Sequence, residues 1–385
     1  MRILMLNNEF PPLGGGTATA NLMLLREWAE VPDLDIDLVT ATTGKAPCLE
    51  SFAASIRIHK VPLGDVNPHH ARNRDLIAYT VKALRVARRL AKEQPYDVVM
   101  TWHAVPAGAI ALWLRLTRHM PYVIRIGGSD IPGHEARYRW ISMALLPLLQ
   151  CIWRLSSGIV VKCETEATKL RRFYRSASCT TIANGVDTQS FHPPTQASRA
   201  AELRLIIVAR LIEHKGHRLL FAAMQTLVEE HAALTLAIVG TGDAEAAYRE
   251  EVANRGLTPY VTFEGYRPRE ALPTLYRSAD VFVLPSEGEG MSISTLEAMA
   301  SGLALVITQT GGTRELLEEE INGLSFAAGD VEALTRHLRR LAADRDLVAS
   351  MGKASREKSL PFSWTRACRG YTALLERVAT TRVRD

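Results

Sequence analysis

The stretch Val281-Phe-Val-Leu-Pro-Ser-Glu-Gly-Glu-Gly-Met-Ser-Ile-Ser-Thr-Leu-Glu-Ala-Met-Ala-Ser301 decides how the fold of this chain is interpreted. Residues 281–284 form a short apolar run that Pro285 ends, which is typical of a buried strand. Residues 296–300 are mostly strong helix formers, so a helix is expected after the glycine-containing turn. A strand, a turn and a helix in this order form the repeating unit of an α/β fold.

The turn carries two carboxylates, Glu289 and Glu297. The start of a helix offers free N–H groups and positive dipole charge, which suit a phosphate. Ionised glutamate only accepts hydrogen bonds, and sugar hydroxyls donate them. The turn therefore predicts a nucleotide-sugar site, with Glu289 beside the sugar and Glu297 beside the ribose. Two alternatives stay open: Glu289 is a surface acid, and Ser294-Thr-Leu-Glu297 is a capping box.

Apolar runs alternate with helical segments along the whole chain. They occupy residues 2–7, 36–40, 98–101, 122–126 and 159–162, then, after a turn-rich stretch ending at Thr195, residues 203–209, 234–239, 261–264, 281–284 and 303–307. This alternation predicts parallel sheets covered by helices. We expect two doubly wound, Rossmann-like domains, residues 1–195 and 196–362, facing each other across a cleft at the strand ends where ligands bind. Residues 364–378 are expected to form a last helix.

Composition excludes several other classes of protein. The chain has 385 residues, of which 47% are hydrophobic and 23% charged, as in ordinary globular proteins. Its five cysteines contain no CxxC pair, which argues against a disulfide framework or a zinc site. We expect a cytoplasmic protein without a signal peptide. The aspartates of Asp33-Leu-Asp-Ile-Asp37 have the spacing of a metal site, but alternation on an edge strand explains them, so we expect no metal and no other cofactor.

The net charge of +5 is spread unevenly. Residues 1–195 hold 23 basic and 16 acidic residues, whereas the remainder holds 23 and 25. Basic residues recur at helical spacing between residues 76 and 92, which fits a solvated helix face or a membrane surface equally well (Lys82, Arg85, Arg88, Arg89 and Lys92). The apolar stretch from Trp140 to Trp153 fits a core helix or an interfacial helix. Nucleic acid is not an expected partner, because no aromatic residues accompany these charges.

Two further groups suit a diphosphate. Gly14-Gly15-Gly16 follows the first strand and either lets N–H groups approach a diphosphate or forms an ordinary turn. It is neither a GxGxxG fingerprint nor a Walker loop. Arg210 and Lys215 follow the first strand of the second half. Two cations there can clamp two phosphoryl groups and neutralise a departing nucleoside diphosphate, and a solvated basic loop is the alternative.

Taken together, these motifs resemble those of the family-4 glycosyltransferases, which have the GT-B architecture. The resemblance covers nearly the whole chain. It is carried by Phe10-Pro-Pro with Gly15-Gly16, Ile182-Ala-Asn-Gly-Val-Asp187 with Phe191-His-Pro193, Val208-Ala-Arg with Lys215-Gly216, Ile238-Val-Gly-Thr-Gly242, Phe263-Glu-Gly265, Ala279-Asp-Val-Phe-Val-Leu-Pro-Ser286, the Glu289 and Glu297 pair, and Gly311-Gly312-Thr-Arg-Glu315. Each motif alone is weak, but their order and spacing are specific.

The resemblance implies a role for each matching residue. Gly15, Gly16, Arg210 and Lys215 would contact the diphosphate of the donor. Backbone N–H groups of Gly290, Met291, Ser292 and Ile293 would hold the phosphates or the sugar. Glu264, Tyr266 and Arg267 would line the base, while Glu289, Arg210 and Lys215 would be the catalytic residues. The resemblance also implies that the segment 363–385 crosses back onto the first domain, and that transfer retains the anomeric configuration without a metal.

One stretch departs from the family pattern. Many relatives carry Thr-x-His-Gly-x-Asp after the fourth strand, whereas this chain has Arg125-Ile-Gly-Gly-Ser-Asp130, with Gly127 at the histidine position. Arg125 and Asp130 either contact the acceptor or the sugar, or form a pair that shapes the loop. The segment Glu289-Gly-Met-Ser292 also replaces the commoner Glu-Gly-Phe-Gly. Both changes concern which sugar and acceptor are bound.

These observations predict a retaining enzyme that moves a hexose-type sugar from a nucleoside-diphosphate-sugar to an acceptor hydroxyl. The basic first half favours a lipid-linked or anionic acceptor, as in cell-surface polysaccharide or glycolipid assembly, and peripheral contact with an anionic membrane at its cytoplasmic face. Three alternatives remain: a nucleotide-sugar epimerase or hydrolase of the same architecture, a nucleotide-sugar-binding module without catalysis, and a soluble carbohydrate synthase.

Overall fold

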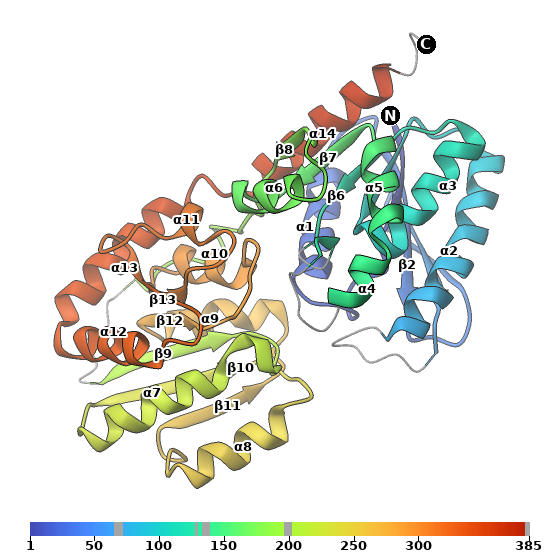
Figure 1. Cartoon of the computed structure of the whole chain (residues 1–385). Helices are drawn as coiled ribbons and strands as arrows, with labels where there is room; N and C mark the ends of the chain where they lie inside the picture. Colours follow the sequence, from blue (N-terminus) through green and yellow to red (C-terminus); the bar gives the residue numbers. More distant parts are fainter. Residues whose placement is uncertain (65–71, 128–129, 133–138, 196–201, 382–385) are drawn as a thin grey trace. The chain divides into compact units, whose positions relative to one another are not determined.

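A computed structural model describes residues 1–64, 72–127, 130–132, 139–195 and 202–381 of the chain. The chain divides into two compact units: unit 1 contains residues 1–183 and 364–385, and unit 2 contains residues 184–363. In each unit a sheet lies between layers of helices (Figure 1). The prediction of two Rossmann-like α/β sheets is therefore confirmed.

The sheet of unit 1 has the strand order β3-β4-β2-β1-β5-β6-β7-β8. All neighbours are parallel except β3 and β4, which pair as an antiparallel hairpin at one edge. The strands are β1 (Arg2–Leu6), β2 (Asp35–Thr42), β3 (Cys48–Ala53), β4 (Ile56–Pro62), β5 (Val98–Trp102), β6 (Tyr122–Arg125), β7 (Gly158–Val161) and β8 (Cys179–Thr181). Strands β1 and β5 are entirely or almost entirely buried, which explains their continuous apolar sequences.

Helices cover both faces of this sheet. They are α1 (Gly16–Ala29), α2 (Asn73–Glu93), α3 (Ala109–Arg118), α4 (Arg139–Ala144), α5 (Leu146–Leu155), α6 (Glu164–Arg171) and α14 (Trp364–Thr381). The last helix, α14, returns to unit 1 as expected and packs on α1, where Trp28 Nε1 donates a hydrogen bond to Thr372 Oγ1 at 3.0 Å. Trp28 also meets Tyr371 edge to face, with 6.2 Å between the ring centroids.

Unit 2 has a six-stranded, wholly parallel sheet of order β11-β10-β9-β12-β13-β14. Its strands are β9 (Leu203–Val208), β10 (Leu234–Val239), β11 (Val261–Gly265), β12 (Val281–Leu284), β13 (Ala304–Thr308) and β14 (Gly323–Phe326). Its helices are α7 (His217–Glu229), α8 (Glu245–Asn254), α9 (Leu272–Arg277), α10 (Ile293–Ala300), α11 (Thr313–Leu316), α12 (Val331–Ala343) and α13 (Arg345–Ser359).

Both strand orders reverse direction at one point. In unit 1 the chain runs outward from β1 through β2 and then returns to place β5 on the other side of β1. In unit 2 it runs outward from β9 through β10 and returns to place β12 beside β9. Loops that leave the carboxyl ends of such strand pairs diverge and form the crevice where open α/β sheets bind ligands. The segment of residues 281–301 begins at one of these points.

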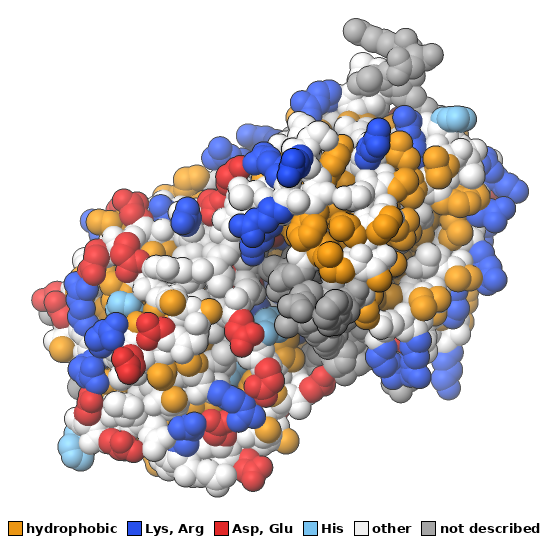
Figure 2. Space-filling view, in the orientation of Figure 1, with side chains coloured by type: hydrophobic (Ala, Val, Ile, Leu, Met, Phe, Trp, Pro, Cys, Tyr) orange, Lys and Arg blue, Asp and Glu red, His pale blue; other side chains and the backbone are white. Residues whose placement is uncertain are grey.

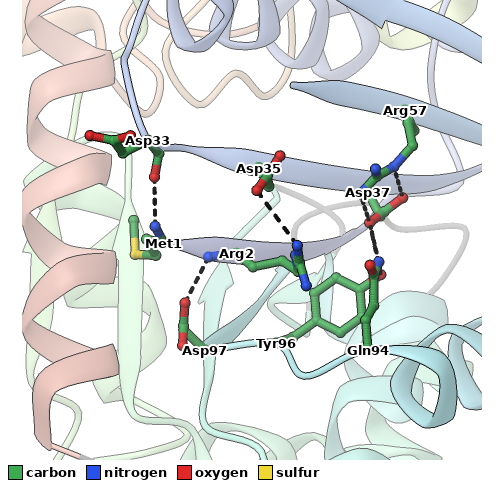
Figure 3. Close-up of polar contacts among 9 residues, drawn as sticks. All are labelled: Met1, Arg2, Asp33, Asp35, Asp37, Arg57, Gln94, Tyr96 and Asp97. Carbon is green, nitrogen blue, oxygen red and sulfur yellow. Dashed lines mark hydrogen bonds and ion pairs between the residues drawn. The ribbon is translucent and has the colours of Figure 1, made fainter. Parts of the chain in front are cut away.

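The aspartates near residue 35 do not lie on an edge strand, so that expectation is wrong. Strand β2 has β4 and β1 as neighbours, and Asp37 is fully buried. Its carboxylate accepts two hydrogen bonds from Arg57, each at 2.8 Å, and one from Tyr96 at 2.8 Å (Figure 3). It also contacts His59 Nε2 at 2.7 Å. Burial raises the pKa of Asp37, but these partners lower it more, so its net pKa is well below the usual value. Asp37 is therefore a buried, ion-paired residue in the interior of unit 1.

The apolar stretch between Trp140 and Trp153 forms two helices, α4 and α5, instead of one. Leu149, Ile152 and Trp153 are buried, while Ile141, Met143 and Leu148 are exposed. Helix α5 thus contributes to the core, as the first alternative predicts, and the other face of α4 and α5 presents apolar side chains to solvent. Among the described residues, no helix combines the length and the apolar character that crossing a bilayer requires.

Candidate functional site

The Lys215 loop follows β9 at the point where the strand order of unit 2 reverses. Arg210 comes two residues after the strand, and the short helical turn η4 (Glu213–Lys215) carries Lys215. The loop then passes through Gly216, which has a φ of +74°. A Cβ at residue 216 would overlap the carbonyl oxygen of Pro285, so only glycine lets this loop pack directly on the end of β12.

Lys215 and Glu289 form an ion pair across the ends of β9 and β12. Ser286 Oγ donates a second hydrogen bond to Glu289 Oε1 at 2.8 Å, and the N–H of Glu287 donates to the carbonyl of His214 at 2.9 Å. The Lys215 and Glu289 side chains are only 15% and 18% exposed. Burial raises the pKa of Glu289, but the Lys215 ammonium and the Ser286 hydroxyl lower it more, so the carboxyl has a lowered pKa and is ionised at neutral pH.

The N-cap of helix α10 is Ser292, two residues before the Ser294 that the capping-box interpretation requires. Ser292 Oγ accepts the N–H of Thr295 at 3.2 Å, which makes Ser292 the N-cap. The proposed Ser294–Glu297 capping box is therefore wrong. Gly290 and Met291 form the approach to the helix, and Asn184 Nδ2 holds the Met291 carbonyl at 2.8 Å. The turn from Gly290 to Ile293, whose N–H groups the resemblance assigns to the phosphates or the sugar, thus leads from Glu289 into the first residue of α10.

A third loop, Gly311–Gly312 after β13, fixes the position of this turn. The N–H of Gly312 donates to the Gly290 carbonyl at 2.6 Å. A Cβ at Gly311 would overlap the carbonyl oxygen of Glu289, and one at Gly312 would lie 2.8 Å from that of Gly290. Together with Leu284, Thr308 and Thr310, Gly312 lines a small hollow beside Glu289 and Ser292. Both glycines belong to a motif noted in the sequence, but their part in this site was missed there.

Glu297 lies in the second turn of α10 and is 2% exposed. Its Oε1 accepts from Arg269 at 2.6 Å, and its Oε2 accepts from the Tyr276 hydroxyl at 3.2 Å. Burial raises the pKa of Glu297 more than Arg269 and Tyr276 lower it. The sequence contained no signal for these two partners, because Arg269 and Tyr276 precede β12 and reach Glu297 only through the fold.

The three residues predicted to line a base occupy the end of β11 and the loop after it. Glu264 and Arg267 form an ion pair at 2.6 Å, and Tyr266 is 73% exposed. An exposed aromatic ring beside a charged pair offers a stacking surface and polar groups. The structure places these residues at the carboxyl edge of the same sheet as Lys215 and Glu289.

Gly15 and Gly16 lie in unit 1, where Gly15 is the N-cap of α1 and Gly16 its first residue. The preceding Gly14 has a φ of +93°, and a Cβ there would lie 2.7 Å from Glu9 Oε2. Gly14 is therefore the glycine on which the turn depends most. It holds Glu9 against the start of α1, a contact that the sequence did not indicate.

Arg125 and Asp130 are both buried in unit 1. Arg125 Nε donates to the Tyr371 hydroxyl at 2.8 Å, and its guanidinium lies over the Trp102 ring, 4.1 Å from the centroid. Asp130 accepts the N–H groups of Ala104 at 2.8 Å and of Gly127 at 2.7 Å. Both side chains thus hold neighbouring elements of unit 1 in place.

Two family models match the chain and together span residues 14–358. The model described as Glycosyltransferase Family 4 matches residues 14–190, and the one described as Glycosyl transferases group 1 matches residues 189–358. The chain belongs to the family-4 glycosyltransferases. The first model covers the Gly14–Gly16 loop, and the second covers Arg210, Lys215, Glu289 and Glu297, in agreement with the predicted family.

Curated relatives come from several kinds of organism. The amylovoran biosynthesis glycosyltransferase AmsK of Erwinia amylovora is 31% identical over 51% of this chain and 50% of its own length. The sulfoquinovosyl transferase SQD2 of Arabidopsis thaliana is 32% identical over 78% and 58%. The matches thus span between half and three fifths of these two relatives. A GDP-mannose-dependent phosphatidylinositol monomannoside mannosyltransferase of Mycolicibacterium smegmatis is 29% identical over 96% of both chains.

Solved structures show the same fold. The sucrose-phosphate synthase of Thermosynechococcus elongatus has a TM-score of 0.87 and 22% identity, over 99% of this chain and 100% of its own. HepE of Anabaena in complex with UDP has a TM-score of 0.71 and 19% identity, over 100% of both chains. At these identities the likeness concerns architecture alone, and it confirms the expected GT-B fold.

Proposed function

We propose that this protein is a retaining glycosyltransferase that moves a hexose-type sugar from a nucleoside-diphosphate-sugar to an acceptor hydroxyl. The observation that carries this proposal is the Lys215–Glu289 ion pair at the reversal point of the unit 2 sheet. In this pair, a cation that can bind a diphosphate contacts an ionised carboxylate that can accept hydrogen bonds from sugar hydroxyls. Both groups lie beside the N-terminal end of α10.

Each group has a separate part in the transfer. Lys215 and Arg210 neutralise the charge that develops on the leaving nucleoside diphosphate, and the N–H groups from Gly290 to Ile293 bind its oxygens. Glu289 orients the transferred sugar through its hydroxyls, which keeps the reacting carbon aligned with the acceptor. These fixed charges supply the stabilisation of the leaving group, so we expect the reaction to need no metal ion.

We assign the remaining donor contacts to the residues that the resemblance implies. Glu297, held by Arg269 and Tyr276, binds the ribose, and Glu264, Tyr266 and Arg267 line the base. Gly15 and Gly16 contact the diphosphate. The ion pair with Arg269 supports this role for Glu297, because it fixes the carboxylate in one orientation before any ligand arrives.

The acceptor is proposed to belong to cell-surface polysaccharide or glycolipid assembly. The relatives from Erwinia amylovora and Mycolicibacterium smegmatis are named for amylovoran biosynthesis and for a phosphatidylinositol-linked acceptor. The mycobacterial relative matches nearly the full chain, and its printed donor is GDP-mannose. A sugar-linked or lipid-linked acceptor fits the surface of unit 1.

This surface combines apolar and basic side chains. Figure 2 shows hydrophobic side chains gathered over α4 and α5, with basic side chains beside them. Ile141, Met143 and Leu148 are between 36% and 46% exposed, and Arg171 and Arg172 on neighbouring α6 are exposed as well. We propose that this face rests on an anionic membrane at its cytoplasmic side, because apolar side chains enter the headgroup region while the arginines bind lipid phosphates.

The experiment supplies radiolabelled UDP-glucose and GDP-mannose, separately, with a lipid extract and with polysaccharide fragments as acceptors. We expect one donor to label one acceptor fraction, with the anomeric configuration kept in the product. Glu289→Ala should lose nearly all transfer, whereas Glu287→Gln, two residues away and exposed, should keep it. Release of free sugar without any acceptor would favour the hydrolase, and full activity of Glu289→Ala would refute the assignment.

A further inference from the structure

His103 lies where unit 1 reverses its strand order. It is the first residue after β5, the strand that follows β1 across the reversal point. The same edge of the sheet carries Glu9 after β1 and Asp130 after β6. This is the position at which an open α/β sheet binds its ligand, and no role was predicted for His103.

The backbone of His103 is strained and held in place by several bonds. Its φ of +71° lies in the left-handed region, which a histidine rarely adopts. The N–H of His103 donates to the Arg125 carbonyl at 3.2 Å, and its own carbonyl accepts from Thr101 Oγ1 and from the Gly108 N–H, each at 3.1 Å. Strain of this kind persists where the surrounding structure fixes it, and such positions cluster at functional sites.

The ring of His103 fills the space that a side chain at residue 127 would occupy. A Cβ at Gly127 would overlap Nδ1 and Cε1 of the ring. The imidazole in this space therefore comes from the residue after β5, and the glycine at residue 127 leaves room for it. Its Nδ1 lies 3.5 Å from Asp130 Oδ2.

The imidazole is buried with one nitrogen unpaired. His103 is 9% exposed; its Nδ1 has the long 3.5 Å contact with Asp130, and its Nε2 has no hydrogen-bond partner among the described residues. A buried polar group without a partner costs free energy, so it indicates a ligand that supplies the missing bond. Burial and the nearby Arg125 lower the pKa of His103, whereas Asp130 and, more weakly, Glu9 raise it. The net pKa is raised, which favours a protonated ring that donates hydrogen bonds.

We propose that His103 is the residue of unit 1 that binds a sugar hydroxyl, and that Asp130 is its positioning residue. The Asp130 carboxylate accepts the N–H groups of Ala104, which follows His103, and of Gly127, which borders the ring, and it also contacts Nδ1 of the ring. The contact predicted for Arg125 and Asp130 is thereby assigned to His103. This inference rests on the proposed function, because a sugar hydroxyl is presented by the donor or by the acceptor.

The test compares His103→Gln with His119→Gln in the full chain. His119 is a matched control, since it also lies in unit 1 with a left-handed φ of +55°, but it is exposed at the end of α3. Gly127→Ala is the second variant, because its methyl group displaces the ring while the histidine stays. Melting temperatures and binding of UDP and GDP are measured first, followed by KM for donor and acceptor and the pH profile of kcat/KM.

His103→Gln and Gly127→Ala should lower kcat/KM at least tenfold and leave UDP or GDP affinity unchanged. A raised KM for the nucleotide-sugar alone assigns the hydroxyl to the donor, and a raised KM for the acceptor assigns it to the acceptor. The ionisation of His103 should disappear from the pH profile of His103→Gln. Unchanged KM and kcat in folded variants that bind nucleotide would overturn the inference. Failure of the proposed function shows separately, as a wild-type chain that binds neither nucleotide.

Discussion

The ammonium group of Lys215 is paired with the carboxylate of Glu289, although 74 residues separate them in the chain. The pair is possible because β9 and β12 are neighbours in the unit 2 sheet, so the loops that follow them leave the same edge. Gly216 packs on Pro285 and the Glu287 N–H bonds to His214, which holds the two loops together around the pair. The account of donor binding depends on this arrangement.

Lys215→Met should reduce kcat/KM for transfer about 100- to 1,000-fold, the usual cost of removing one charged donor from a developing anion. Methionine keeps most of the unbranched apolar stem of lysine, so packing against the loop changes little. Initial rates at several donor concentrations measure the effect. Lys358→Met is the control, since Lys358 pairs with Glu318 at 3.4 Å and lies on α13, outside the site. Equal losses in both variants would contradict the role of Lys215.

Gly311→Ala should weaken nucleotide binding at least tenfold without unfolding unit 2. The added methyl overlaps the Glu289 carbonyl, so the turn that carries Glu289 and Gly290 must shift. Gly370→Ala serves as the control, because its Cβ would meet only Ile182 at 3.5 Å and the residue lies in helix α14. Titration calorimetry with UDP or GDP provides the measurement, and an unchanged affinity in Gly311→Ala would show that the turn is not part of the site.

Asp37→Asn should destabilise the protein by about 3–5 kcal/mol at neutral pH, because Arg57 and His59 lose a buried partner. The folded pKa of Asp37 is lowered, so its contribution is present above the unfolded value of 3.8 and is lost as pH falls toward the folded pKa. Urea unfolding between pH 2 and pH 7 should therefore show a flatter acid limb for the variant than for the wild type. A parallel loss of stability in both proteins below pH 4 would contradict this.

Leu148→Glu should reduce binding to vesicles that contain anionic lipid, because it places a negative charge in the apolar face of α4 and α5. Leu49→Glu is the control: Leu49 is also 62% exposed, but it lies on β3, the edge strand of the unit 1 sheet. Co-sedimentation at low salt should separate the two variants, and high salt should weaken wild-type binding by screening the arginines of α6. If wild-type protein does not sediment with the vesicles at low salt, the membrane proposal fails.

Most of the parallel core could be predicted because its strands are buried on both faces and have continuous apolar sequences. Strands such as β12 and β10 lie at the expected residues, 281–284 and 234–239. The hairpin of β3 and β4 was not predicted. Strand β3 is largely exposed, so its sequence alternates too weakly to stand out from a loop.

The candidate site also contains residues that could be predicted from local sequence and residues that could not. Lys215 and Glu289 follow strands and could be placed from local sequence, whereas Arg269, Tyr276 and His103 could not. Their contacts depend on side chains that meet only after distant loops converge. The start of α10 was also misplaced, because Ser292 and Ser294 both suit an N-cap and local sequence does not distinguish them.

The most direct test of donor binding in unit 2 is titration calorimetry of UDP, GDP and their sugar derivatives against the wild-type chain and against Lys215→Met. The account predicts that one nucleoside diphosphate binds to the wild type with one site per chain and that Lys215→Met weakens this binding at least tenfold. If no nucleotide binds, or if binding is equal in the two proteins, the Lys215–Glu289 pair is not a donor site.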